Sequence, residues 1–414
     1  MDAPGTPAYV ENVSVHDRTQ SAFERHSMAT ISAVGDVRVF RDDPETTFQH
    51  VGDYFRSMDI SFCQSESAYS DKGSEGSSGP RGASPRDLKG YPAFAAAGFD
   101  VVSMASNHTM DWGKDALLDC LERMHGDGMQ TIGAGADLAE ARTPALFEKD
   151  GTTIAFLGYC SVAPISYYAV PGRAGVAPMR AITHYEALEE DQPGTPCEVM
   201  TWPLPRDLEA LVEDVRKARE QADLVFVSLH WGIHYTPALI ADYQPVVAHA
   251  AIDAGAAGII GHHPHILKGI EVYRGRPIFY SLGNFVLDTN SGYRPTDHAW
   301  RNKLKAAYAQ FGTAGPYDYR EQDEPNYSMV AKLEVDGGEL RRVSFRPVFI
   351  ENKTPKMYSV TDPRGADILR YVREITEKAG LDTSFRIDGE DIVVELDGGA
   401  LAGVVDMESR RAGV

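Results

Sequence analysis

Residues 258–288 read GIIGHHPHILKGIEVYRGRPIFYSLGNFVLD and place three histidines, His262, His263 and His265, within four positions after a glycine. The segment begins as an apolar run, so these imidazoles follow directly on a predicted buried strand. Buried imidazole nitrogens are costly unless something uses them, and metal binding is the commonest such use. If the segment is extended, His263 and His265 place both rings on the same side. We therefore expect a metal site here, with its remaining ligands supplied by other parts of the chain.

The composition limits what the protein binds. The chain has 414 residues, of which 43% are hydrophobic, and a formal net charge of −20. The hydrophobic fraction allows a sizeable core in one large domain or two. Nucleic acids and anionic membrane surfaces attract basic proteins, so the charge argues against both classes of partner. It does not exclude an anionic substrate, because a bound metal ion reverses the local field.

The sequence also predicts the setting of the protein. Its four cysteines are far apart and show no CxxC spacing, which is typical of reduced thiols in a reducing compartment. No run approaches the roughly 20 apolar residues that a membrane helix needs. Residues 1–27 are polar and do not resemble a signal peptide. We therefore expect a flexible N-terminal arm over residues 1–27, no membrane anchor and a cytoplasmic protein. The sequence leaves the oligomeric state unknown.

Apolar strands alternate with helices over most of residues 28–350. Strands are predicted at 29–40, 59–67, 129–135, 152–160, 223–232 and 257–263. This alternation predicts an α/β fold with a layered, largely parallel or mixed sheet. Residues 161–204 are interpreted as an irregular excursion. Residues 351–414 are predicted to form a small C-terminal α+β extension with one helix and one hairpin.

Polar side chains that bind metals stand where the predicted strands end. They are Asp36, Glu66, Asn107, His108, His230, His263 and His265. Strand ends in an α/β sheet converge on one edge, which is where such folds place their sites. Asp36 taken alone is equally typical of a turn cap, but the set as a whole predicts a site. Oxygen and imidazole donors together favour Mn²⁺, Fe²⁺ or Zn²⁺ over Mg²⁺ or Ca²⁺.

Five stretches are specific enough to compare with known families. They are GDV around Asp36, SMASNHTMDWG (103–113), HWGIHY (230–235), GHHPHILKGIEVYRG (261–275) and YSLGNFVLD (280–288). They resemble motifs of the CapA family, which is known for poly-γ-glutamate capsule synthesis and belongs to the calcineurin-like metallophosphoesterase superfamily. The resemblance implies a four-layer αββα sandwich of metallophosphoesterase type over residues 28–350, with metal held by loops at one sheet edge. It also implies a peptide, glutamyl-amide or other polyglutamate-like substrate.

The chain departs from the family pattern at three positions. Gln64 and His234 stand where the family usually has Asn and Glu, and Arg38 stands where the superfamily often has His. His234, together with His298 in the polar stretch 289–325, offers a second acid/base group.

The resemblance and the strand-end pattern together assign roles. The predicted metal ligands are Asp36, Glu66, Asn107, His230, His263 and His265. The predicted catalytic residues are Asp36, His108, His234 and His262. The predicted substrate contacts are Arg38, Tyr167, Tyr168, Asn284 and His298.

These residues fit more than one reaction. Metal-dependent hydrolysis or transfer on a peptide or glutamyl-amide substrate is favoured. The alternative is a metal-dependent peptide Cα epimerase of lasso-peptide biosynthesis, an activity that the CapA family is reported to include. Phosphoester hydrolysis is the third interpretation. A non-catalytic binding module is disfavoured, because such a module would have lost ligands and the set here is nearly complete.

Overall fold

The computed structural model describes residues 28–74, 87–189, 191–192, 194–288 and 324–396. The expected N-terminal arm and His298 lie outside the described residues, so the predictions made for them stay predictions.

The first of two large sheets is built around β1 (Ala29–Arg38). Its other strands are β2 (Ile60–Ser65), β3 (Val101–Ser103), β4 (Gln130–Ile132), β15 (Asn284–Leu287), β16 (Tyr327–Asp336), β17 (Glu339–Glu351), β18 (Thr354–Met357), β19 (Phe385–Asp388) and β20 (Asp391–Val394). In the described residues the order is β19-β20-β17-β16-β1-β2-β3-β4, and β15 and β18 pair with β1 and β17. β1 is parallel to β2 and antiparallel to β16, so the sheet is mixed.

The second large sheet carries the histidine-rich segment. Its strands are β6 (Ala145–Lys149), β7 (Thr152–Cys160), β11 (Leu224–His230), β12 (Gly258–His262), β13 (Ile270–Tyr273) and β14 (Arg276–Phe279). The order among the described residues is β13-β14-β12-β11-β7-β6. β7, β11 and β12 run parallel, so their carboxyl ends reach the same edge.

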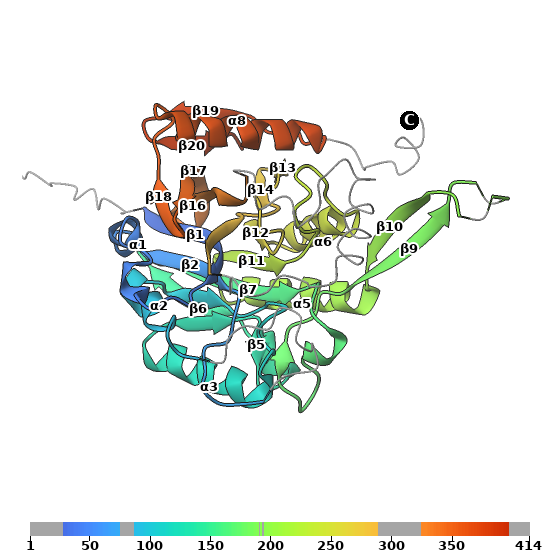
Figure 1. Ribbon diagram of the computed structural model, residues 1–414, viewed down its shortest axis with the longest axis horizontal. Helices are drawn as coiled ribbons and strands as arrows, with labels where there is room; N and C mark the ends of the chain where they lie inside the picture. Colours follow the sequence, from blue (N-terminus) through green and yellow to red (C-terminus); the bar gives the residue numbers. More distant parts are fainter. Residues whose placement is uncertain (1–27, 75–86, 190, 193, 289–323, 397–414) are drawn as a thin grey trace, which may run out of the picture.

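Helices cover the outer faces of both sheets (Figure 1). α1 (Gly52–Arg56), α2 (Pro92–Ala97) and α3 (Gly113–Gly126) share a buried apolar cluster with the first sheet. α5 (Pro205–Arg219) and α6 (Tyr243–Asp253) share another with the second sheet. Between the sheets lies a third cluster, where Phe62 of β2 stacks on Phe156 of β7 with ring centroids 6.1 Å apart. The expected four-layer αββα architecture is therefore confirmed.

The inner faces of the two sheets supply the core that joins them. Phe156 also stacks on Phe226 of β11, with ring centroids 5.7 Å apart, and all three phenylalanines are at most 1% exposed. Burying a side chain of this size contributes about 1.5–3 kcal/mol. The apolar runs of β2, β7 and β11 therefore decide how the sheets dock.

The C-terminal segment closes one end of this core. α8 (Pro363–Lys378) is capped by Asp362, whose carboxylate accepts a hydrogen bond from the backbone N–H of Arg364. Ile368, Val372 and Ile375 of α8 are buried in the cluster between the sheets. β20 pairs with β17, so the hairpin extends the first sheet. None of the helices in the described ranges combines the length and the apolar character needed to cross a bilayer.

The prediction that residues 161–204 are irregular is wrong for their second half. β9 (Ala181–Ala187) and β10 (Cys197–Pro203) form a two-stranded antiparallel hairpin that projects from the body of the molecule (Figure 1). Neither strand has a continuous buried face, and Tyr185 is 66% exposed. Strands of this kind do not need the alternation of apolar and polar residues that identifies a half-buried strand, so that pattern did not predict β9 and β10.

Candidate metal centre

A β-bulge in β1 aims Asp36 at the space between the sheets. Ala33 pairs with Phe62 of β2, and the next paired residue, Asp36, stands opposite Gln64. Three residues of β1 therefore advance against two of β2, which is the signature of a bulge. Before the bulge Ala33 belongs to the inter-sheet core, whereas after it Val37 belongs to the core beneath the outer helices. The extra residue thus turns Asp36 inward, toward the second sheet.

The bulge requires glycine at position 35. A Cβ on Gly35 would lie 2.0 Å from the carbonyl oxygen of Gly283, a distance that real Cβ atoms do not adopt. The same carbonyl accepts a hydrogen bond of 3.0 Å from the backbone N–H of Asp36. The GD pair of the sequence therefore joins β1 to the turn before β15, and glycine permits the close approach.

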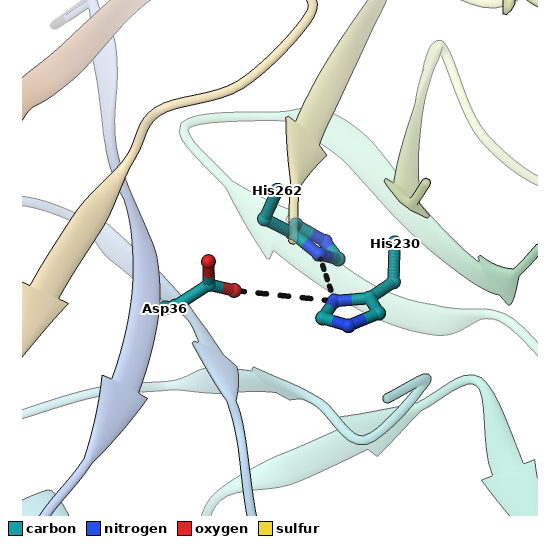
Figure 2. A group of neighbouring side chains, drawn as sticks. All are labelled: Asp36, His230 and His262. Atoms are coloured by element: carbon teal, nitrogen blue, oxygen red, sulfur yellow. Dashed lines mark hydrogen bonds and ion pairs between the residues drawn. The ribbon is translucent and has the colours of Figure 1, made fainter. Parts of the chain in front are cut away.

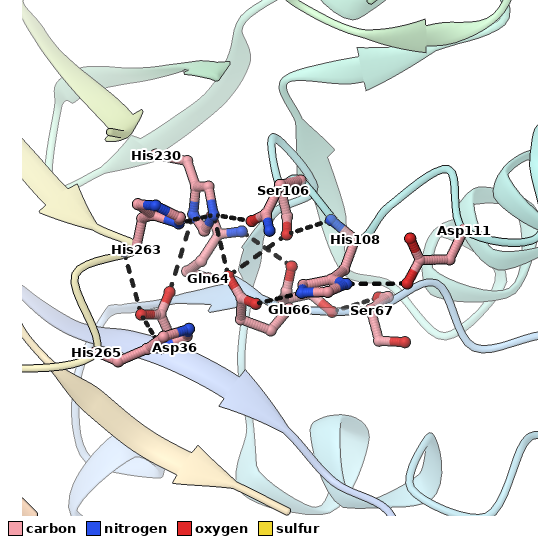
Figure 3. Close-up of polar contacts among 12 residues, drawn as sticks. Asp36, Gln64, Glu66, Ser67, Ser106, His108, Asp111, His230, His263 and His265 are labelled. Carbon is pink, nitrogen blue, oxygen red and sulfur yellow. Dashed lines mark hydrogen bonds and ion pairs between the residues drawn. The ribbon is translucent and has the colours of Figure 1, made fainter. Parts of the chain in front are cut away.

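One nitrogen of His230 lies at the centre of the predicted ligand set (Figure 3). His230 Nε2 is 2.6 Å from Asn107 Oδ1, 3.1 Å from Glu66 Oε1 and 3.2 Å from His263 Nδ1. A single imidazole nitrogen has one proton or one lone pair and cannot satisfy three such neighbours. Ligand atoms about 2.1 Å from one metal ion are spaced by roughly 3 Å from each other. The spacing of these four atoms therefore fits donors that share an ion.

Asp36 approaches the same histidine from the first sheet. Its Oδ1 is 3.9 Å from His230 Nδ1, and its Oδ2 is 3.4 Å from His265 Nδ1. Asp36 Oδ1 and Glu66 Oε2 are buried and have no hydrogen-bond partner among the residues that the structure describes. Buried carboxylate oxygens are normally paired. Two such oxygens beside neutral imidazoles match the donor chemistry of a divalent cation.

His262 lies next to His230, and the two rings are joined by a hydrogen bond (Figure 2). Ligand atoms of Asp36, His230 and His262 all lie within 4.8 Å of one another, so this buried group could hold a metal ion. However, His262 Nδ1 is 2.8 Å from His230 Nδ1, and His262 Nε2 is 2.7 Å from Ser228 Oγ. Both His262 nitrogens therefore have hydrogen-bonding partners, an arrangement that orients the ring of His230.

Burial decides the charge of these groups. Desolvation raises the pKa of Asp36 to about 8, opposed by the hydrogen bond from the His263 N–H. Desolvation also lowers the pKa values of His230 and His263 well below the usual range and that of His262 to about 3. The imidazoles are therefore neutral at pH 7, the form that binds metals. The raised pKa of Asp36 is a consequence of its burial, which a bound cation would offset.

His108 stands at the more exposed side of the cluster. Its side chain is 18% exposed, whereas those of Glu66 and His230 are at most 1% exposed. His108 Nδ1 is 2.9 Å from Asp111 Oδ2, and the Tyr167 hydroxyl donates to Asp111 Oδ1 at 3.2 Å. His108 Nε2 is 3.9 Å from Glu66 Oε2. An imidazole whose Nδ1 faces a carboxylate presents Nε2 to the site, as acid/base histidines do.

His234 joins the cluster from the loop after β11. Its ring centroid is 4.0 Å from that of His263 and 5.2 Å from that of His265, with the rings of His234 and His265 nearly parallel. Burial lowers the pKa of His234 well below the usual range. The loop is held by Lys268, whose ammonium donates to the carbonyl oxygens of Thr236 and Leu239.

The backbone of the histidine cluster differs from the extended form that the sequence suggested. His263 and His265 have φ values of 99° and 59°, in the left-handed region that non-glycine residues rarely adopt. Asn284 fixes the second ring, because its Oδ1 lies 2.9 Å from His265 Nδ1 and its Nδ2 donates to the His265 carbonyl. The two rings therefore reach the site through a strained loop, a feature that clusters at functional sites.

Several residues expected to contact substrate are buried. Tyr167 and Tyr168 are 2% and 4% exposed, and Asn284 is 5% exposed. The structure brings Tyr167 to Asp111 and Asn284 to His265, so both reach the cluster through another residue, whereas the Tyr168 hydroxyl accepts from the backbone N–H of Ala163. These three side chains pack inside the protein because the surrounding loops bury them. The sequence did not indicate this burial.

Some residues of the cluster were not anticipated. Ser106, Ser228 and Lys268 were given no role from the sequence, although Ser228 precedes His230 by two residues on the same face of β11. Ser106 Oγ accepts from the His108 backbone N–H at 3.1 Å. The period of two along a strand was the signal that could have identified Ser228.

Comparisons with known proteins identify the family of this chain. The family described as bacterial capsule synthesis protein PGA_cap matches residues 12–289. The chain is 36% identical over 191 residues to the PGA biosynthesis protein CapA of Bacillus subtilis, covering 46% of this chain and 43% of that protein. It is 33% identical over 218 residues to a probable polyglutamine synthesis accessory protein of Mycobacterium tuberculosis, covering 52% of each. The chain thus spans about half the length of these curated relatives.

Among solved structures, a hypothetical protein from Thermus thermophilus is similar at 17% identity with a TM-score of 0.41. The alignment covers 77% of this chain and 98% of that one.

Proposed function

This chain belongs to the bacterial capsule synthesis protein family PGA_cap, and from that premise we propose that it is a metal-dependent enzyme that hydrolyses or transfers a peptide or glutamyl-amide bond. The observation that carries the proposal is the pair His108 and Asp111 beside the atoms gathered around His230 Nε2. This pair supports the proposal because it would supply an acid/base group beside the proposed metal ligands.

The residues proposed to hold the ion are Asp36, Glu66, Asn107, His230, His263 and His265. Their mixture of imidazole and oxygen donors favours Zn²⁺, Mn²⁺ or Fe²⁺ over Mg²⁺ or Ca²⁺. When bound, such an ion polarises a carbonyl oxygen and lowers the pKa of water. The two unpartnered carboxylate oxygens, Asp36 Oδ1 and Glu66 Oε2, support this assignment.

The chain's own residues move the proton. In the neutral ring, Asp111 accepts the Nδ1 proton of His108, which leaves a lone pair on Nε2. Tyr167 holds the other oxygen of Asp111, so the carboxylate cannot rotate away from the ring. His108 Nε2 then takes a proton from the attacking nucleophile and returns it to the departing amine, which is general acid–base catalysis.

The substrate is proposed to be polyglutamate-like. The names of the Bacillus subtilis and Mycobacterium tuberculosis relatives refer to PGA biosynthesis and polyglutamine synthesis. A γ-linked glutamate polymer offers repeated amide bonds, each with a free carboxylate nearby.

Epimerisation at a peptide Cα is the second candidate, and the position of His234 favours it. His234 contacts His263 and His265, whereas His108 contacts Asp111 and lies near Glu66. Inversion of a Cα centre requires one group to remove a proton and another to deliver one, and two separate imidazoles provide such a pair.

Mass spectrometry in D₂O separates these functions. The Zn²⁺- or Mn²⁺-loaded protein is incubated with a γ-linked glutamate oligomer, and cleavage or transfer products are expected. Deuterium uptake at Cα without cleavage would show that the reaction is epimerisation and not hydrolysis. His108→Gln should lower kcat by about 10²–10⁴-fold, the usual contribution of a general acid–base group.

Matched variants make this test specific to the pair. Asp111→Asn should lower kcat while leaving KM unchanged, because Asp111 acts through His108. His50→Gln and Asp115→Asn, at exposed positions, should retain wild-type turnover. Full activity of His108→Gln would refute the proposed role of the pair.

A further inference from the structure

Arg38 is the last residue of β1 and follows Asp36 by two positions. Residues two apart on a strand point to the same face. The intervening Val37 and the following Val39 are buried in the core beneath the outer helices. The side chain of Arg38 therefore extends from the same face of β1 as the Asp36 carboxylate, toward the candidate metal centre.

This guanidinium has no counter-charge in the part of the chain that the structure describes. Arg38 is only 9% exposed, its Nε is buried without a hydrogen-bond partner, and no ion pair within 4.0 Å joins it to a described carboxylate. Its guanidinium lies over the ring of Phe40, with Cζ 5.7 Å from the ring centroid. Charged groups this buried are normally paired.

Other sheltered arginines of the molecule show the usual arrangement. Arg41, three residues further on, binds both carboxylate oxygens of Asp288 at 2.9 and 2.8 Å. Arg180 binds both oxygens of Asp207 in the same way, at 2.6 and 2.8 Å. Arg41 and Arg180 are thus each paired with a carboxylate. Arg38 departs from this pattern beside the site.

The charge of Arg38 acts on the candidate ligands. Burial raises the pKa of Glu66, and Arg38 is among the charges that oppose that rise. Burial lowers the pKa of His265, and Arg38 lowers it further. Arg38 is therefore close enough to influence the metal centre electrostatically without forming an ion pair with it.

We propose that Arg38 binds a carboxylate of the substrate next to the metal centre, so that the enzyme selects a carboxylate-bearing peptide over a neutral one. This inference rests on the proposed function. A guanidinium presents parallel N–H groups that match the two oxygens of a carboxylate. In a chain of net charge −20, a polyanionic substrate needs such a local positive group to enter.

The first test measures stability without any substrate. A partnerless buried cation is unfavourable, so Arg38→Met should raise the unfolding temperature by about 2–4 °C. Replacing an arginine that is paired with a carboxylate should instead lower the unfolding temperature, because the carboxylate would be left without its partner. The matched variant Arg41→Met, which leaves the Asp288 carboxylate without its partner, should lower the unfolding temperature. A clear fall for Arg38→Met would overturn the inference.

The second test measures selectivity by calorimetric titration. The probes are a γ-linked glutamate oligomer and the same oligomer with its α-carboxylates converted to carboxamides. Arg38→Met should weaken binding of the acid form about 10- to 100-fold, in the range of one charge-assisted bidentate pair, and leave the amide form unchanged. Arg38→Lys should restore part of the loss. Arg206→Met, at an exposed position, should bind both probes as the wild type does.

The outcomes distinguish this inference from the proposed function. Equal weakening of both probes, no weakening, or no binding of the acid form by the wild type would overturn the role of Arg38. Selective binding of the acid form that depends on Arg38, without cleavage, transfer or Cα exchange, would uphold the inference and refute the proposed chemistry.

Discussion

Lys268 allows a quantitative prediction about stability and pH. It lies three residues beyond His265, is 2% exposed, and donates to the backbone carbonyls of Thr236 and Leu239, the latter at 3.0 Å. No described carboxylate pairs with it. Burial lowers its pKa from the ordinary 10.5 to about 7. We predict that Lys268→Met changes how the free energy of unfolding depends on pH.

The sign follows from proton binding. Between about pH 7 and pH 10 the unfolded chain keeps its lysine protonated while the folded chain has lost the proton, so the unfolded state binds more protons. The free energy of unfolding contributed by Lys268 therefore rises with pH in that window, by about 1.4 kcal/mol per pH unit. Near pH 7 about half of the folded molecules are still protonated, so the gain from pH 7 to 9 is about 2 kcal/mol. Below about pH 6 the contribution is flat.

Chemical denaturation of wild type and Lys268→Met at pH 5.5, 7 and 9 measures this directly. The difference between the two proteins should be constant from pH 5.5 to nearly 7 and should shift by about 2 kcal/mol in favour of the wild type by pH 9. Lys114→Met removes an exposed lysine of α3 and controls for the loss of one charge. Parallel pH profiles for wild type and Lys268→Met would refute the reasoning.

Two further predictions concern the bulge and the cation. Gly35→Ala should destabilise the fold by about 3 kcal/mol in denaturant titrations, because its Cβ would lie 2.0 Å from the Gly283 oxygen. Gly126→Ala, where a Cβ meets no atom within 4 Å, should not destabilise it, and equal behaviour of the two variants would contradict the role of the bulge. Removal of divalent metal with a chelator should lower the unfolding temperature and Zn²⁺ or Mn²⁺ should restore it, with about 2.7 kcal/mol gained at 100 times the dissociation constant. His230→Ala should show no metal-dependent change, and a shift equal to that of the wild type would refute the assigned ligands.

The fold was largely predictable from the sequence because its inner strands are long apolar runs. The runs at 152–160 and 223–232 have enough buried residues to identify β7 and β11 without knowledge of their neighbours. The meeting of Asp36, Glu66 and His230 followed from a general property of sheets, since parallel strands end at one edge.

The rest depended on contacts that local patterns do not encode. The φ values of His263 and His265 follow from how the loop docks on Asn284, not from the preferences of histidine. The sequence predicted Tyr167 as a substrate contact, yet it is 2% exposed and its hydroxyl donates to Asp111, which lies 56 positions earlier in the chain. Periodicity indicates which side of an element is buried but not what covers an irregular segment. The functional roles of the individual site residues remain predictions.

The scattered origin of the site determines when it forms during folding. Asp36 and His263 are 227 positions apart, and Asn107 and His230 are 123 positions apart. Bringing together residues so far apart in the chain costs conformational entropy before any stabilising contact forms. These atoms therefore meet only after both sheets have formed and docked. A metal ion held by these residues would therefore bind late in folding, after most of the chain has been synthesised. Such a cation would not nucleate this fold, and its uptake would report that the two sheets have been correctly assembled.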